Sequence, residues 1–403
     1  MKSFFKKNQH VLLITVCILL LAAICAVLPR FLSSHYISAA ASNPDGMEET
    51  STAPETPVFV PSYVSTPEPV KAIYMTSWVA GTPALRSNLV KIMDDTEINA
   101  VVIDIKDYSG KIVFPVSDQK LKAFGSEEVR VADMQDFIEM LHKKGIYVIG
   151  RVAVFQDAYF VKQRPDLAVK NLAGTATWKD RKGISWIDAG SKDYWDYIIE
   201  IAKESRKVGF DEINFDYIRF PSDGDMKDIS FPQSSTTPKS VVLKNFFEYL
   251  HDNLQGSGLK ISADLFGMTT TASDDMGIGQ ILENALPYFD YVSPMVYPSH
   301  YPATFMGYAQ PEAHPYEVIK YAMGSAVTRA EALASSTGQD QLAYKNKLRP
   351  WLQDFGLGMT YTATEVDAQI RATYDIGLTS WLLWSASNKY TTGALQQATD
   401  NTE

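Results

Sequence analysis

The chain has 403 residues, of which 46% are hydrophobic and 21% are charged, enough apolar material for a large folded core. Its formal net charge of −10 argues against a nucleic-acid partner, because such partners are bound by an excess of basic side chains. Both cysteines, Cys17 and Cys25, lie near the N-terminus, so the rest of the chain can form neither a disulfide nor a thiolate nucleophile.

The N-terminal segment indicates where the protein acts. Lysines among the first seven residues precede an apolar run from Val11 to Leu28, long enough for a helix to cross the hydrocarbon core of a membrane. We therefore expect residues 1–30 to form a basic cytoplasmic segment and an uncleaved transmembrane signal-anchor, with the rest of the chain outside the cytoplasm. Cleavage near Ala39–Ala41 would instead release a secreted protein.

The composition changes twice beyond this segment. Residues 31–70 are rich in Pro, Ser, Thr and Glu and cannot bury enough apolar surface to fold, so we predict a linker there. From residue 71 to about 398, short β-rich runs alternate with amphipathic helical stretches. This alternation is typical of βα units built around a parallel sheet.

Eight strand-like runs predict an α/β fold, the (β/α)8 TIM barrel. A doubly wound open sheet is the structural rival, but no glycine-rich phosphate loop follows the first strand. The expected strands are Ala72–Val79, Ala100–Ile105, Tyr147–Val154, Glu212–Ile218, Lys260–Leu265, Tyr291–Val296, Pro350–Phe355 and Ser380–Trp384. The expected helices include Met134–Lys144, Ser191–Val208 and Val241–Leu254.

Two aspartates are expected to meet inside this barrel. Strand residues face the helices and the interior alternately, and the apolar neighbours of Asp216 and Asp264 suit the helix-facing side. Both aspartates then point inward near the carboxyl ends of adjacent strands. Cleavage of a glycosidic bond needs such a pair, one as nucleophile or base and the other as acid. Either aspartate could instead be structural, paired with Arg151 or Arg219.

Further carboxylates follow other strands and are possible alternatives. Asp104 and Asp107 lie at the end of the second strand, and Asp354 lies near the seventh, where it could replace Asp264 as the second catalytic group. Asp107 begins an Asp-Tyr-Ser-Gly sequence and is equally suited to form a turn.

Aromatic and basic side chains are predicted to surround the aspartates. Flat rings suit stacking on sugar faces, although most aromatic residues in any protein belong to the core. The expected substrate-binding residues are Trp78, Arg151, Tyr217, Arg219, Tyr297, His300, Tyr301, Trp351 and Trp384. Among them, His300 is better suited to a hydrogen-bonding wall than to catalysis.

Other chemistries lack their motifs. The sequence contains no HxxxH or HExxH pair for a zinc hydrolase, no GxSxG elbow for an esterase and no Walker loop. We therefore assign no cofactor and no metal site, while scattered aspartates leave calcium binding open.

Several segments resemble a bacterial family named "Putative glycosyl hydrolase domain", from about residue 71 to 395. The segments that carry the resemblance are VIDIKDYSG at 102–110, GFDEINFDYIRFP at 209–221, ISADLFG at 261–267, SPMVYPSHY at 293–301 and RPWLQDF at 349–355. The resemblance implies a TIM barrel distantly similar to amylase-type glycosidases, in which a strand-four aspartate, here Asp216, is the nucleophile. Those enzymes typically carry a strand-five glutamate, whereas this chain has Asp264.

The leading hypothesis is thus a glycoside hydrolase acting on a cell-envelope or extracellular polysaccharide, with Asp216 as nucleophile or charge stabiliser and Asp264 as general acid. A transglycosidase fits the same residues. The alternative from another class is a non-catalytic glycan-binding protein on a barrel scaffold, since the fold alone does not dictate activity. The sequence leaves the sugar, the stereochemical outcome and the oligomeric state open.

Overall fold

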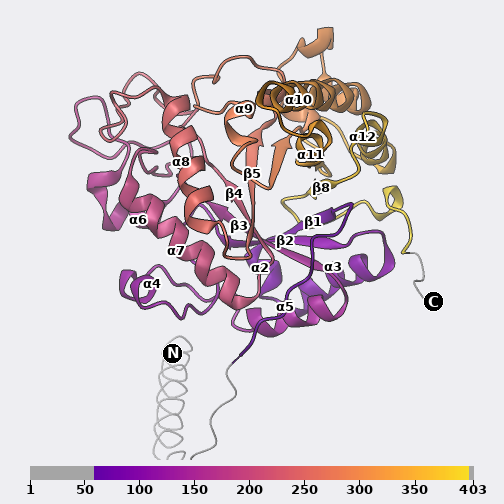
Figure 1. The fold of residues 1–403 in the computed structure, drawn as a ribbon, viewed down its shortest axis with the longest axis horizontal. Coiled ribbons are helices and arrows are strands. Elements are labelled where there is room, and N and C mark those ends of the chain that lie inside the picture. The colour runs from indigo at the N-terminus through magenta and orange to yellow at the C-terminus, as the bar shows by residue number, and fades with distance from the viewer. Residues whose placement is uncertain (1–58, 399–403) are drawn as a thin grey trace, which may run out of the picture. The chain divides into compact units, whose positions relative to one another are not determined.

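Eight parallel strands close into a barrel in the order β1 to β8 (Figure 1). The computed structural model describes residues 59–398. The predicted (β/α)8 barrel is confirmed, with one observed strand inside each predicted range or within a residue of it. The strands are β1 (Lys71–Met75), β2 (Ala100–Lys106), β3 (Tyr147–Ala153), β4 (Glu212–Asp216), β5 (Lys260–Phe266), β6 (Tyr291–Met295), β7 (Trp351–Gln353) and β8 (Trp381–Trp384).

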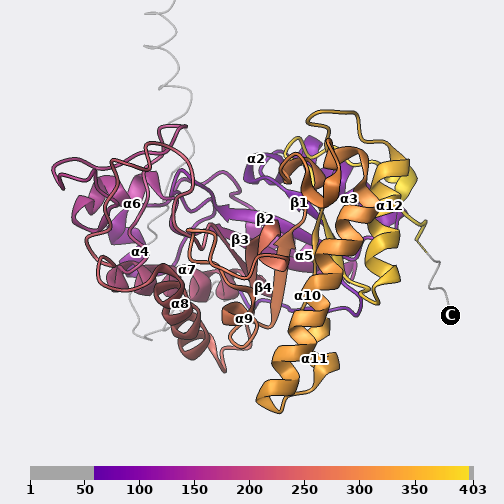
Figure 2. The same cartoon turned by 90° about the horizontal axis from the view of Figure 1, so that it is seen from above.

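Helices cover the outside of the barrel, and α10 and α12 pack side by side (Figure 2). The three helices expected from the sequence are present as α5, α7 and α8. The helices are α2 (Ser77–Ala80), α3 (Pro83–Asp95), α4 (Gln119–Phe124), α5 (Met134–Lys143), α6 (Ala158–Gln163), α7 (Lys192–Val208), α8 (Lys239–Leu254), α9 (Leu282–Ala285), α10 (Pro315–Thr337), α11 (Gln341–Asn346) and α12 (Ala363–Asp375).

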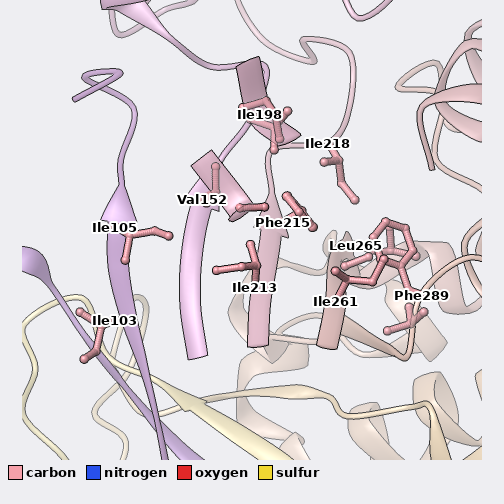
Figure 3. Packing of buried hydrophobic residues seen from close by; sticks show 14 of the residues in the cluster. Ile103, Ile105, Val152, Ile198, Ile213, Phe215, Ile218, Ile261, Leu265 and Phe289 are labelled. Carbon is pink, nitrogen blue, oxygen red and sulfur yellow. The ribbon is translucent and has the colours of Figure 1, made fainter. Parts of the chain in front are cut away.

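The alternation of side chains along the strands separates two apolar cores. Ile213 and Phe215 of β4 pack outside the barrel with Ile261 and Leu265 of β5 and with Ile198 of α7, in one large cluster (Figure 3). Residues of the opposite parity fill the interior in a second, smaller cluster. Since the apolar residues of β4 and β5 face outward, the polar residues between them are left to face the barrel interior.

The first strand ends earlier than predicted. We expected it to continue to Val79, but β1 stops at Met75 and the chain turns into α2. Thr76 caps this helix, because its hydroxyl accepts a hydrogen bond from the Val79 amide at 3.2 Å. The apolar residues that read as a continuing strand therefore belong to a short helix, which carries Trp78 above the rim of the barrel.

The connections after β3 and β4 are long and pair with each other. The amide of Lys170, after β3, donates to the Ser230 carbonyl, after β4, at 3.0 Å. The indole of Trp178 donates to the Asp225 carbonyl at 3.0 Å. Together the two connections form a lobe around α6, at the left of Figure 2. This lobe brings side chains from two loops to one side of the barrel mouth.

The segment that leads into β1 contacts the barrel beside the amino ends of its strands. The Tyr63 hydroxyl donates to the Arg206 carbonyl at 2.9 Å, and the Val64 amide donates to Asp211 at 2.8 Å. The end of the predicted linker is thus held against the barrel. The predicted signal-anchor and the rest of the linker fall within residues 1–58, outside the described residues. No helix between residues 59 and 398 is both long and apolar enough to cross a bilayer.

Candidate active site

One guanidinium, that of Arg151 on β3, connects the carboxylates at the carboxyl ends of the strands. Its Nη2 and Nε donate to Oδ2 of Asp216 at 2.5 and 3.1 Å, and its Nη1 donates to Oδ1 of Asp104 at 2.6 Å. Burial alone would lower the pKa of Arg151, but the charges of Asp216 and Asp104 raise it well above its ordinary value. Arg151 is therefore a fixed cation between β2 and β4.

Asp264 on β5 has a different environment. Its side chain is almost completely buried, and its Oδ1 accepts hydrogen bonds from Nδ2 of Asn214 at 2.8 Å and Nε1 of Trp351 at 2.7 Å. Its Oδ2 accepts no hydrogen bond from any described residue. Burial, and next the negative charge of Asp216, raise the pKa of Asp264 well above its ordinary value. Oδ2 is therefore the atom positioned to hold a proton.

The two aspartates lie close together. Strand pairing sets Phe215 opposite Ala263, one residue before each aspartate. Because Nε of Arg151 lies 3.1 Å from Oδ2 of Asp216 and 3.9 Å from Oδ2 of Asp264, these two oxygens are at most about 7 Å apart. Carboxyl groups that act together in glycosidases are separated by roughly 5 to 9.5 Å. Both aspartates line one cavity of about 210 Å³.

The cavity wall combines five aromatic residues with two arginines. It contains every predicted substrate-binding residue except Trp78 and Trp351, together with four residues that we did not predict. The lining residues besides the two aspartates are Arg151, Tyr217, Arg219, Phe266, Gly267, Met268, Met295, Tyr297, His300, Tyr301 and Trp384.

The four unpredicted residues lie at or directly after the carboxyl ends of β5 and β6. Phe266 is the last residue of β5, the strand of Asp264, and Gly267 and Met268 follow it directly. Met295 is the last residue of β6. A side chain at Gly267 would place its Cβ 2.3 Å from the Met295 carbonyl oxygen, so glycine allows the two strand ends to approach. The position two residues before the predicted Tyr297 could have indicated Met295, because alternate strand residues share a face.

Trp78 and Trp351 lie outside the cavity wall for opposite reasons. Trp351 is buried beneath the cavity and contacts Asp264 through its indole N–H. Trp78 is 62% exposed on α2, with the guanidinium of Arg130 lying 4.4 Å from its ring centroid. Trp351 thus supports an aspartate from below, while Trp78 stands apart from the cavity.

The alternative carboxylates are occupied elsewhere. Asp107 accepts hydrogen bonds from the Ser109 amide and pairs with Arg130 at 2.6 Å, in the turn that its sequence suggested. Asp354 accepts from the amide and hydroxyl of Thr391 at 2.8 and 2.6 Å. Neither lines the cavity. Between residues 59 and 398, no group of three or more His, Cys, Asp or Glu side chains is arranged to hold a metal ion.

Asp104 lies behind Arg151 and also does not line the cavity. Besides its bond to Arg151, it accepts a hydrogen bond from the Tyr74 hydroxyl. The Tyr74 ring stacks on Trp384 with ring centroids 4.0 Å apart. Asp104 therefore links Arg151 to an aromatic side of the cavity.

The backbone after Asp216 adopts an unusual conformation. Tyr217 has a φ of +53°, in the left-handed region that residues with a side chain rarely adopt. Its amide donates to Oδ1 of Asp216 at 2.5 Å. This turn orients the Asp216 carboxylate and brings the Tyr217 ring into the cavity wall, a local strain of the kind that clusters at functional sites.

Residues 72–390 match the family model described as "Putative glycosyl hydrolase domain". The chain belongs to this family. The match includes every residue of the cavity wall. No protein with a curated record matches the chain in sequence.

Two solved structures with TM-scores above 0.5 share the fold of this chain, and a third is similar in sequence over half of it. The PgaB (BpsB) glycoside hydrolase domain from Bordetella bronchiseptica is 14% identical over 79% of this chain and 94% of its own, with a TM-score of 0.56. Alpha-L-fucosidase isoenzyme 2 from Paenibacillus thiaminolyticus is 12% identical over 81% of this chain and 47% of its own, with a TM-score of 0.51. A hypothetical protein from Ruminiclostridium thermocellum ATCC 27405 is 34% identical over 51% of this chain and 98% of its own, with a TM-score of 0.44.

The raised pKa of Asp264 predicts a specific dependence of stability on pH. Above the unfolded-state pKa of about 3.9, the unfolded chain releases this proton while the folded chain keeps it, so stability falls until the pH passes the folded-state pKa. We expect Asp264→Asn to remove this loss. Within that pH window, the difference between the free energy of unfolding of the variant and that of the wild type should rise by about 1.4 kcal/mol per pH unit.

Asp107→Asn is the matched control, because the pKa of Asp107 is shifted in the opposite direction. Burial raises the pKa of Asp107, but hydrogen bonds from Ser109 and Arg130 outweigh burial and lower it. Its contribution to stability is present above the unfolded-state pKa and is lost as pH falls through the folded-state pKa. Urea unfolding of both variants across pH measures the two trends; parallel trends would refute the assignment for Asp264.

Proposed function

We propose that this chain is a glycoside hydrolase that cleaves a cell-envelope or extracellular polysaccharide at the mouth of its barrel. The observation that carries the proposal is the contrast between two aspartates of one cavity. Asp216 is ion-paired with Arg151, whereas the pKa of Asp264 is raised by burial and by its neighbour. A nucleophile must be ionised and a general acid must hold its proton at the working pH. Membership of the family supports the reaction class.

In the first half of the proposed reaction, a carboxylate oxygen of Asp216 bonds to the anomeric carbon of the sugar. The bond from that carbon to the glycosidic oxygen breaks, and Asp264 gives the leaving oxygen its proton. In the second half, the Asp264 carboxylate takes a proton from water, whose oxygen attacks the anomeric carbon. The bond to Asp216 then breaks, and both aspartates return to their starting states. Arg151 orients Asp216 throughout.

The spacing of the carboxyl groups supports two displacements rather than one. Inverting enzymes leave space for a water molecule and separate their carboxyl groups by roughly 6.5 to 9.5 Å, whereas retaining enzymes separate them by roughly 5 to 5.5 Å. The Oδ2 atoms of Asp216 and Asp264 lie at most about 7 Å apart, a limit that favours the shorter, retaining separation. We therefore propose retention of the anomeric configuration.

We further propose that the barrel works outside the cytoplasm, attached to the membrane by residues 1–30. The support is the apolar run that follows the N-terminal lysines, and the absence of cysteine after Cys25. Protease added to intact cells should then digest the barrel and leave a cytoplasmic marker protein intact. Protection of the barrel until the membrane is permeabilised would contradict the proposed location.

Substitution of the acids tests the catalytic assignment. We expect Asp216→Asn and Asp264→Asn each to lower kcat on a cleaved envelope polysaccharide by about a thousandfold, within the range that covalent and acid catalysis supply. Asp354→Asn is the control and should stay within a few fold of wild type, because Asp354 bonds to Thr391 away from the cavity. Reducing-end release measures the rates.

The outcomes separate the proposal from its alternatives. Equal turnover by wild type and Asp216→Asn would contradict the assignment of the nucleophile. Binding of a glycan by wild type with no cleavage and no transfer to an added acceptor sugar would favour the non-catalytic glycan-binding protein. Transfer to the acceptor with little hydrolysis would identify a transglycosidase that uses the same two aspartates.

Proton NMR of the freshly formed product tests the proposed retention. We expect the first detectable product to have the anomeric configuration of the substrate, because two successive displacements at one carbon restore it. The opposite anomer appearing first, followed by slow mutarotation, would show a single displacement by water and would contradict the proposed role of Asp216 as nucleophile.

A further inference from the structure

The two arginines of the cavity have contrasting surroundings. Arg151 has carboxylate oxygens of Asp104 and Asp216 within hydrogen-bond distance and one of Asp264 at 3.9 Å. Arg219 has no carboxylate within 4.0 Å among residues 59–398, although both guanidiniums line the same cavity. Arg151 is buried and Arg219 is half-buried, and an arginine withdrawn from water ordinarily has an anionic partner, because an unpaired charge loses hydration.

Aromatic rings and one hydrogen-bonding edge hold the Arg219 guanidinium in place. Its central carbon lies 4.9 Å from the ring centroid of Trp186 and 5.6 Å from that of Tyr217. Its Nη1 donates to the Phe220 carbonyl at 3.0 Å and to the Ser222 hydroxyl at 3.1 Å. Its Nε and Nη2 donate to no other described residue. A fixed cation thus has donors to spare in the wall of the cavity.

The nearest acids do not neutralise this cation. Asp216 is paired with Arg151, and Oδ2 of Asp180 accepts hydrogen bonds from Gln156 and Trp186. Burial lowers the pKa of Arg219, and the charges of nearby groups, Asp216 and Asp223 among them, offset this effect only in part. An arginine remains charged at neutral pH even so. The charge therefore lines the cavity with no carboxylate at ion-pairing distance in the described part of the chain.

We propose that Arg219 binds a carboxylate carried by the sugar substrate, so that the preferred substrate class is an acidic glycan. This inference rests on the proposed function, because it takes from that proposal that the cavity binds a sugar. A planar carboxylate matches the fork of donors that a guanidinium presents, and such charge-assisted bonds are stronger than bonds to neutral hydroxyls.

The charge of the whole chain makes a local cation necessary for such a substrate. With a formal net charge of −10, the protein repels a polyanion at long range. A fixed guanidinium close to Asp216 and Asp264 would compensate for that repulsion at the point of cleavage. A neutral glycan could offer Arg219 only hydroxyl groups, which bond to a guanidinium less strongly than a carboxylate does.

Binding of matched ligands tests the inference. The probes are oligogalacturonides, hyaluronan oligosaccharides and muramic-acid fragments of peptidoglycan, each with its carboxyl groups free or methyl-esterified. For at least one pair, wild type should bind the free acid about 10- to 100-fold more tightly than the ester, the range expected for a hydrogen bond between charged groups. Calorimetry at low salt measures the binding.

Three variants locate the effect. Arg219→Gln should reduce the preference for the acid to less than about twofold, and Arg219→Lys should retain part of it, because lysine keeps the charge but loses the fork. Arg181→Gln is the matched control, since Arg181 is exposed in the same lobe and lies outside the cavity wall, and it should leave the preference unchanged.

The results separate this inference from the proposed function. A preference for the acid that depends on Arg219 supports the inference even if no glycan is cleaved. The lack of cleavage would then contradict only the proposed hydrolase activity. Equal binding of acid and ester in every pair, or a preference that survives Arg219→Gln, would overturn the inference whether or not a glycan is cleaved.

Discussion

The barrel mouth depends on a buried cation, the guanidinium of Arg151. It bonds to Asp104 on β2 and Asp216 on β4 and lies 3.9 Å from Asp264 on β5. Without it, acidic groups on these strands would be buried with no compensating charge, which costs several kcal/mol for each ion. Burial and the charge of Asp216 raise the pKa of Asp264, and Arg151, 3.9 Å away, opposes that rise only in part. Asp216 pairs directly with the guanidinium, so the two aspartates of the cavity have different surroundings.

The rest of the fold fixes this arrangement in position. Apolar residues of β4 and β5 pack against the helices, which leaves the inner face of both strands for polar groups. At the other end of the barrel, Glu212 is paired with Arg349 and accepts a hydrogen bond from Tyr147. The interior is therefore filled from below, and the polar cavity lies at the carboxyl ends of the strands, as in TIM-barrel enzymes generally.

The sequence predicts the parts of this site that follow from strand periodicity. Alternation alone indicated that Asp216 and Asp264 face inward, because side chains two residues apart share a face. It could not show where a strand ends or what a loop contacts. Trp78 was expected at the substrate because its strand seemed to continue, and Asp354 because it lies near the end of the predicted seventh strand. The bond of Asp354 to Thr391 could not be foreseen, because it joins two separate segments of the chain. The place of Trp186 against Arg219 likewise depends on long loops whose paths no periodicity encodes.

The most direct test of the central claim is infrared difference spectroscopy at neutral pH between wild type and Asp264→Asn. We predict that the difference spectrum contains the carbonyl band of a protonated carboxyl group, present in wild type and lost in the variant, with no change in the carboxylate bands. Loss of an ionised carboxylate band instead, with no change in the protonated region, would show that Asp264 is ionised beside Asp216. That result would contradict the division of roles between the two aspartates.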